Sequence, residues 1–233
     1  ALAADYRVVC PDVVGRGRSG KLRDPSGYGI PQYVADMVTL IARLDVDSVH
    51  WVGTSMGGMI GMALAAQEST PVLRLVLNDV GPLVTVEALE RIATYVGTDP
   101  TWASLDEAMA YIRVISAPFG QLDEVQWRHL SEYSVGRRPD GRWGFVYDPL
   151  IAAPFKAAYN GQPIDLWPLY EGVRCPTLVI RGAESDLLTR DTWRQMGERG
   201  PRAKLAEIPG VGHAPMFLSA DQIAVVRDFL LAA

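Results

Sequence analysis

The sequence predicts an α/β protein with a mostly parallel central sheet and helices on both faces. Apolar, β-prone segments alternate with segments of helical periodicity, which is the rhythm of a parallel sheet covered on both sides. The 233 residues are enough for one such domain with a sizeable core. Polar residues directly follow several of the expected strands, at the sheet edge where open parallel sheets bind their ligands.

The first part of the chain is expected to supply three strands and two helices. Pro31 stands in the first turn of the first helix, where a missing N–H is tolerated, and the apolar residues after it recur on one stripe. The residues before position 7 are typical of the end of a helix. Strands are expected over residues 7–10, 48–52 and 73–78, and helices over residues 31–44 and 59–66.

The alternation stops near residue 83 and resumes near residue 176. Ser104 with Glu107, and Ser219 with Gln222, have the spacing of helix N-terminal caps. Helices are expected over residues 86–95, 105–115, 123–134, 191–198 and from 219 onward, with strands over 177–180 and 204–208. We therefore expect a core of residues 1–82 and 171–233, with a helical insertion over 83–170. The insertion holds 13 of the 20 aromatic residues, so it must pack a small core of its own or line an apolar pocket.

A sharp turn is predicted around Ser55, in the stretch Gly53-Thr54-Ser55-Met56-Gly57. The strand before it and the helix after it make the G-x-S-x-G pattern a strong signal, whereas the pattern alone is weak. The turn is expected to strain the backbone of Ser55 and expose its hydroxyl. Gly53 and Gly57 are both expected to be needed, because side chains there would collide.

The residues at the expected strand ends are Ser55, Asp79, Asp186 and His213. A serine hydroxyl becomes a good nucleophile when a neighbouring base takes its proton, and a histidine base needs a carboxylate to fix its tautomer. These residues fill all three roles in the chain order Ser, Asp, His. They therefore predict nucleophilic catalysis by a serine.

His213, in a glycine-rich loop at a strand end, is the histidine placed to reach Ser55. His50 lies inside the strand before the turn, where a structural role is expected, and His129 belongs to a helix of the insertion.

Asp186 is predicted as the acid, because it follows the strand adjacent to the one that supplies His213. Asp79 is the alternative, although it could equally hold a turn or cap a helix. Glu184 stands two residues too early and is expected to be solvated.

The loop from Gly15 to Lys21 matches the dinucleotide-binding pattern G-x-G-x-x-G and most of a phosphate-binding loop. Both motifs need a helix to begin at once, so that its N-terminal amides face phosphate. Pro25 and Pro31, with glycines between them, prevent this. We expect a glycine-rich turn with a basic rim and no nucleotide.

Composition and net charge limit the partners and the cellular compartment that are expected. A net charge of −5 without a stripe of basic residues argues against nucleic acid or an anionic membrane as partner, and no apolar run is long enough to span a bilayer. Cys10 and Cys175 are the two cysteines, and no disulfide is expected between them, which fits a reducing compartment such as the cytoplasm.

Four segments together resemble the α/β-hydrolase superfamily: the Gly53–Gly58 turn, the loop from Asp12 to Ser19, the Gly182–Asp186 strand exit and the Gly212-His213 loop. The resemblance covers essentially the whole chain, with residues 83–170 in place of the family's variable cap. It is closest to small bacterial esterases, enol-lactonases and C–C bond hydrolases, and the serine argues against the branches that use aspartate there. It implies that the Met56 backbone N–H is one oxyanion donor.

One part of the family pattern is missing. The resemblance implies a mid-sheet strand between the strands of residues 7–10 and 49–53, ending in a His-Gly loop that supplies a second oxyanion donor. The sequence contains neither. We therefore expect that this sequence belongs to a longer chain with further N-terminal strands.

The function predicted from these observations is that of a serine hydrolase acting on a small ester or lactone through an acyl-enzyme. Ser55 attacks, His213 transfers the proton and Asp186 orients His213. No metal or organic cofactor is implied. Two alternatives remain: cleavage of a C–C bond in a diketone-type substrate by the same residues, and a non-catalytic ligand-binding protein on the same fold.

Overall fold

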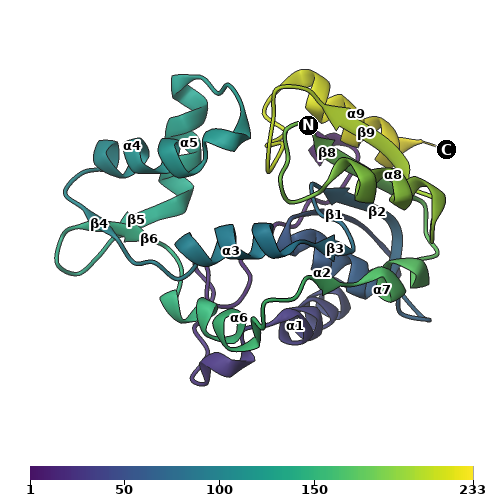
Figure 1. Cartoon of the computed structure of the whole chain (residues 1–233), viewed down its shortest axis with the longest axis horizontal. Helices are drawn as coiled ribbons and strands as arrows, with labels where there is room; N and C mark the ends of the chain where they lie inside the picture. The colour runs from purple at the N-terminus through teal and green to yellow at the C-terminus, as the bar shows by residue number, and fades with distance from the viewer. Residues whose placement is uncertain (233) are drawn as a thin grey trace.

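A four-stranded parallel sheet forms the centre of the molecule. The computed structural model describes residues 1–232 (Figure 1). The strands lie in the order β1, β2, β8 and β9, and all three neighbouring pairs are parallel. Their bounds are β1 Val49–Thr54, β2 Val72–Asn78, β8 Thr177–Gly182 and β9 Lys204–Ile208. This confirms the predicted α/β class, because strands that follow one another through helical crossovers lie side by side with a common direction.

Helices cover both faces of the sheet. Along β2, Leu75 and Leu77 point to one face and Val76 to the other, as the two-residue repeat of a strand requires. The Leu75 side packs against α1 (Ile30–Arg43), α2 (Met56–Ala65), α7 (Trp167–Gly172) and α8 (Arg190–Glu198). The Val76 side packs against α9 (Ala220–Leu231). Each face therefore has its own apolar core.

The segment between β2 and β8 contains a separate lobe. In Figure 1, α4, α5 and the sheet β4-β6-β5 project to one side of the parallel sheet. The lobe has its own apolar cluster, which includes Trp102, Met109, Ile112 and Trp127. The helices of the segment are α3 Val86–Tyr95, α4 Leu105–Ile115, α5 Glu124–Ser134 and α6 Ala152–Ala158. Its strands are β3 Leu83–Val84, β4 Thr101–Trp102, β5 Val135–Arg137, β6 Trp143–Phe145 and β7 Ile164–Asp165. These strands of two or three residues are too short to leave an alternating pattern, so they were not predicted.

The predicted strand over residues 7–10 is wrong. Those residues have no regular structure, and Val8 and Val9 are 52% and 41% exposed. A β-prone sequence becomes a strand when a neighbour completes its hydrogen bonds, and β1 ends the sheet on this side without pairing to residues 7–10. The short 3-10 helices are Leu2–Ala4, Pro25–Gly27, Ala117–Phe119 and Pro149–Ile151.

The two predicted capping boxes differ from their expected form. The Ser104 hydroxyl accepts a hydrogen bond from the Glu107 backbone N–H at 3.1 Å, as predicted, but the Glu107 carboxylate accepts from Ala103 instead of Ser104. The Ser219 side chain makes no cap, and Gln222 Oε1 instead accepts the Phe217 backbone N–H at 2.9 Å. Over residues 1–232, no helix has the length and apolar content needed to cross a membrane.

Candidate active site

Ser55 lies at the turn between β1 and α2, as predicted. Its backbone has φ 51° and ψ −121°, a strained conformation that lifts the side chain clear of the turn. A Cβ on Gly53 would lie 2.2 Å from the Gly57 carbonyl oxygen, so Gly53 is required. The prediction for Gly57 is wrong, because a Cβ there would meet nothing within 4 Å. The second close approach is at Gly58, where a Cβ would lie 2.4 Å from a methyl group of Val80.

The Met56 backbone N–H opens helix α2. As the first residue of the helix it has no intrahelical acceptor, and it stands directly after Ser55. The positive end of the helix dipole lies at the same point. A group bound at the Ser55 hydroxyl would therefore find a hydrogen-bond donor beside it.

His213 reaches Ser55 from the loop after β9. Its Nε2 atom lies 3.0 Å from Ser55 Oγ, and its side chain is 15% exposed. The loop folds over the ends of β8 and β2: a Cβ on Gly182 would lie 2.2 Å from the Gly212 carbonyl oxygen, and Asn78 Nδ2 donates to the Pro215 carbonyl at 2.8 Å. Through these contacts the loop crosses the ends of β8 and β2, so that His213 lies at the end of β1.

Asp79, at the end of β2, is the carboxylate that contacts His213. Its Oδ2 atom lies 2.8 Å from His213 Nδ1, and the side chain is fully buried. Two further donors hold the same carboxylate: the Gly182 backbone N–H on Oδ1 at 2.8 Å and the Ser185 hydroxyl on Oδ2 at 2.6 Å. A buried carboxylate needs such donors, because desolvation otherwise disfavours its charge.

The structure does not bring Asp186 to His213, which corrects the prediction. The Asp186 side chain is 53% exposed and forms an ion pair with Arg91 of α3. The adjacency of two strands does not decide which side chain of the loop after β8 faces inward. Ser185 is the residue of this loop that turns inward, and its neighbours Glu184 and Asp186 both turn outward to solvent.

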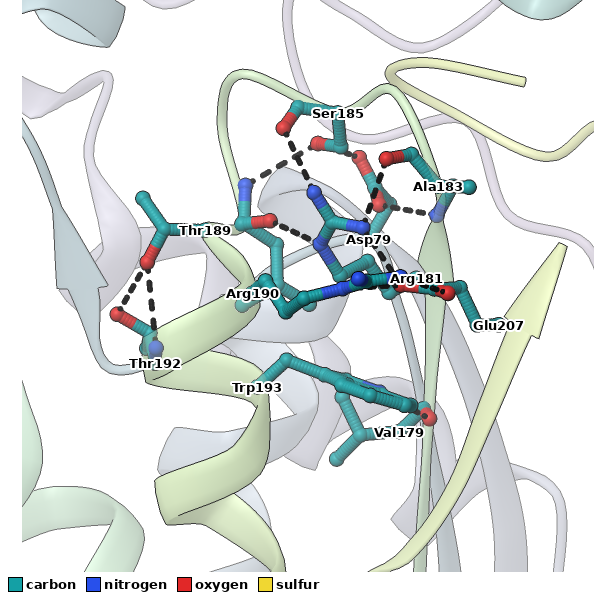
Figure 2. A network of polar contacts seen from close by, with 12 residues as sticks. Asp79, Val179, Arg181, Ala183, Ser185, Thr189, Arg190, Thr192, Trp193 and Glu207 are labelled. Carbon is teal, nitrogen blue, oxygen red and sulfur yellow. Dashed lines mark hydrogen bonds and ion pairs between the residues drawn. The ribbon is translucent and has the colours of Figure 1, made fainter. Parts of the chain in front are cut away.

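The buried guanidinium of Arg181 fixes the loop that carries Ser185 (Figure 2). It donates to the carbonyls of Ala183 at 2.9 Å, Ser185 at 3.2 Å and Leu188 at 2.8 Å. It also pairs with Glu207 of β9 at 2.8 Å, with 6% of the Arg181 side chain exposed. Sequence reasoning missed both Arg181 and Ser185, because a basic residue inside a strand and a serine between two acids show no catalytic pattern on their own.

The other two histidines and the two cysteines lie outside the chain of contacts from Ser55 to Asp79. His50 Nδ1 contacts the Tyr6 hydroxyl at 2.9 Å, and burial, followed by the nearby Arg74 charge, lowers the pKa of His50. His129 is exposed on α5 and packs on Tyr133. Cys10 and Cys175 are free thiols.

No phosphate or metal cradle is formed by the described residues. The loop from Gly15 to Lys21 leads into irregular chain, and α1 begins only at Ile30, so no helix N-terminus directly follows the loop. Within residues 1–232, no group of three His, Cys, Asp or Glu side chains is spaced to hold a metal ion. Ser55, His213 and Asp79 form a chain of hydrogen-bonded side chains.

Comparison with known proteins gives matches along the whole chain. A family model described as the alpha/beta hydrolase family matches residues 1–226. The 3-hydroxybutyrate-oligomer hydrolase of Cupriavidus necator is 48% identical over 240 aligned positions, which cover 100% of this chain and 82% of that protein. The 2-hydroxy-6-oxo-2,4-heptadienoate hydrolase of Pseudomonas putida is 26% identical, over 99% of this chain and 80% of that protein.

Solved structures match equally well. An alpha/beta hydrolase from Novosphingobium aromaticivorans has a TM-score of 0.89 and 36% identity, over 98% of this chain and 81% of that chain. An enol-lactonase from Burkholderia xenovorans has a TM-score of 0.65 at 22% identity, over 94% of this chain and 78% of that chain, and this likeness concerns the fold alone.

Proposed function

Because the chain belongs to the alpha/beta hydrolase family, we propose that it hydrolyses a small ester by means of Ser55, His213 and Asp79. The observation that carries the proposal is the hydrogen-bonded chain of these side chains, with 3.0 Å between Ser55 Oγ and His213 Nε2 and 2.8 Å between His213 Nδ1 and Asp79 Oδ2. This is the arrangement in which a serine nucleophile, a general base and an orienting carboxylate cooperate.

The tautomer of His213 follows from its neighbours. The Asp79 carboxylate accepts a hydrogen bond, so Nδ1 carries the proton and Nε2 is left with a free lone pair facing Ser55. When Ser55 attacks the ester carbonyl, His213 Nε2 takes the hydroxyl proton. The buried negative charge of Asp79 stabilises the imidazolium that forms.

The rest of the reaction uses the same groups. The Met56 N–H donates to the oxyanion of the tetrahedral intermediate. His213 then gives its proton to the departing alcohol oxygen, which leaves an ester between the substrate acyl group and Ser55. Water, activated by His213, attacks this acyl-enzyme, and the carboxylic acid is released as Ser55 recovers its proton.

The most similar relative named above supports a substrate class. That protein is called a 3-hydroxybutyrate-oligomer hydrolase, and oligomers of a hydroxy acid are joined by ester bonds. We infer that this chain also cleaves esters between small hydroxy acids. We further infer that residues 83–170 act as a cap, because a cavity of about 420 Å³ lies between this segment and the loop of residues 12–17.

The test is hydrolysis of the linear dimer of 3-hydroxybutyrate by the full-length protein, compared with Ser55→Ala. We expect release of monomer by the wild type and a loss of roughly a thousandfold or more in the variant. A fluorophosphonate probe is expected to label the wild type and not Ser55→Ala. Unlabelled, inactive wild type would favour a ligand-binding protein that has kept only the fold.

A C–C bond hydrolase is the second candidate, favoured by the 26% identity to the heptadienoate hydrolase. The same protein sample is assayed with a vinylogous 1,5-diketone. Turnover of the diketone at a higher kcat/KM than any ester would replace the ester proposal with this one.

A further inference from the structure

A cavity between the glycine-rich loop and the insertion contains a basic side chain that the proposed reaction does not use. The cavity has a volume of about 420 Å³, within the range of small-ligand sites. Arg16 lines it on the side of the glycine-rich loop, and the insertion supplies most of the other lining residues. The aromatic residues that line the cavity are Tyr95, Tyr111, Tyr133, Phe145 and Tyr147.

The contacts of Arg16 are all with neutral groups. Its Nη1 atom donates to the Val14 carbonyl and the Tyr33 hydroxyl, each at 3.3 Å, and Nη2 lies 3.4 Å from the Met56 sulfur. The guanidinium lies over the Tyr33 ring, 5.3 Å from its centroid, which holds the plane in place. Among residues 1–232, no carboxylate lies within 4.0 Å of Arg16.

The absence of a charged partner distinguishes Arg16 from other arginines nearby. Arg138 is paired with Asp99, and Arg91 is paired with Asp186. Of the five N–H donors of a guanidinium, three are used by the contacts of Arg16, which leaves the Nε hydrogen and one Nη2 hydrogen without a protein acceptor. These two donors are free to bind the oxygens of a carboxylate.

Arg16 also contacts the residue that follows Ser55. Its Nη2 atom contacts the side chain of Met56, whose backbone N–H is the proposed oxyanion donor and which directly follows Ser55. Asp12, the acidic residue of the cavity wall, accepts the Arg18 backbone N–H at 2.9 Å and lies 4.0 Å from the Arg18 side chain.

We propose that Arg16 binds a carboxylate group of the substrate, so that the enzyme acts preferentially on anionic esters. The inference rests on the proposed ester hydrolysis at Ser55. A linear ester between two hydroxy acids ends in one free carboxylate, a few bonds from the ester carbonyl. With the carbonyl at Ser55, that carboxylate enters the cavity and pairs with the two free donors of the guanidinium, while the aromatic side chains of the cavity contact its alkyl groups. Because the chain has a net charge of −5, a local cation is needed to hold an anionic substrate.

The experiment compares two substrates of nearly identical shape: the linear 3-hydroxybutyrate dimer and its terminal carboxamide. Both contain the same scissile ester, and only the charge of the end group differs. We expect wild type to have the higher kcat/KM for the carboxylate. In Arg16→Gln the ratio of the two kcat/KM values is expected to fall roughly ten- to a hundredfold, because a charge-assisted hydrogen-bonded pair is lost. Arg16→Lys is expected to keep part of the preference, since it retains the charge but not the fork.

Arg18→Gln is the matched control. It removes the same charge two residues away from a side chain that is fully exposed, and we expect an unchanged ratio. The ratio is internally normalised, so partial misfolding of a variant lowers both rates and leaves the ratio intact. An unchanged ratio in Arg16→Gln, or an equal fall in Arg18→Gln, would overturn the inference while leaving the proposed function standing. Hydrolysis of neither substrate by wild type, or of both by Ser55→Ala, would overturn the proposed function and this inference with it.

Discussion

The Ser185 hydroxyl donates to Asp79 Oδ2 at 2.6 Å, the same oxygen that contacts His213 Nδ1 at 2.8 Å. The loop after β8 therefore takes part in the site through a hydroxyl, and the carboxylate comes from β2. Asp79 is fully buried, so its carboxylate is contacted by these protein donors and not by solvent. The predictions below separate these roles.

Asp79→Asn is expected to lower kcat by roughly 10³- to 10⁴-fold, because an amide cannot hold His213 in the correct tautomer or stabilise its charged form. Asp186→Asn is the comparison at the other strand exit. It removes an exposed ion pair with Arg91, so we expect a change in kcat of less than about threefold and in unfolding free energy of less than about 1 kcal/mol. Steady-state kinetics on one ester substrate measures kcat for both variants, and urea denaturation measures their unfolding free energies. A severe defect in Asp186→Asn with normal kcat in Asp79→Asn would reverse our assignment of the acid.

Ser185→Ala is expected to lower kcat roughly tenfold with little change in KM, since it removes a hydrogen bond to a buried charge that positions His213. Ser185→Thr keeps the hydroxyl and is expected to retain more of the activity. Ser131→Ala is the control: this serine is equally buried, but its hydroxyl donates to the Trp127 carbonyl, far along the insertion. If kcat falls as much in Ser131→Ala as in Ser185→Ala, the effect comes from general packing and not from the contact with Asp79.

Gly53→Ala and Gly57→Ala are expected to have opposite effects on stability. At Gly53 the added methyl would lie 2.2 Å from backbone, which must displace the turn and cost at least about 2 kcal/mol. At Gly57 the methyl meets nothing within 4 Å, and alanine in a helix is favoured over glycine by about 0.5–1 kcal/mol. Urea denaturation measures both values. Equal destabilisation by the two substitutions would contradict the geometry of the turn.

Arg181→Met is expected to destabilise the fold by about 3 kcal/mol, because it leaves three loop carbonyls and Glu207 without their buried donor. Arg190→Met is the matched control. Arg190 pairs with the same Glu207, but its side chain is 54% exposed, so a much smaller loss is expected. Similar decreases in unfolding free energy for the two variants would show that burial of Arg181 does not increase its contribution to stability.

The stability of the fold is also expected to depend on pH through Glu207. The hydrogen bond from Arg190, supported by Arg181 and partly opposed by burial, lowers the pKa of Glu207 below its ordinary value of 4.5. A carboxyl with a lowered pKa in the folded state stabilises that state above the unfolded pKa, and this contribution is lost as pH falls through the folded pKa. Below about pH 4.5, the unfolding free energy of Glu207→Gln should therefore fall less steeply with decreasing pH than that of wild type. Parallel curves for the two proteins would contradict this.

The parts of the fold and site that sequence predicts well are those encoded locally. The turn at Ser55 and the loop of His213 have short patterns of glycine and strand residues, and both are placed as those patterns indicate. The choice between Asp79 and Asp186 depends instead on how two loops fold over one another. Asp79 adopts φ 51°, and its side chain is held by the backbone of Gly182, a contact between residues 103 positions apart that no local pattern encodes.

The other differences between prediction and structure also arise from contacts that no local pattern encodes. Residues 7–10 have strand composition, but a strand forms only with a partner, and composition carries no information about partners. The insertion was predicted from its three longest helices, whose periodicity is clear, whereas its strands are too short to have one. Gly57 and Gly58 look interchangeable in the sequence, and only the packing of Val80 distinguishes them.

Some side chains of the loop between Gly182 and Leu188 face the core and others face solvent. We expect the two groups to tolerate substitution differently. Arg181 and Ser185 hold the inner side, while Glu184 and Asp186 face outward and contact no group of the proposed reaction. Because the carboxylate that contacts His213 comes from β2, the two outward positions can be randomised without removing a residue of the proposed reaction. They are therefore suitable sites for directed evolution. A substitution of Asp186 also removes its ion pair with Arg91 and so changes a contact between the core and α3 of the insertion.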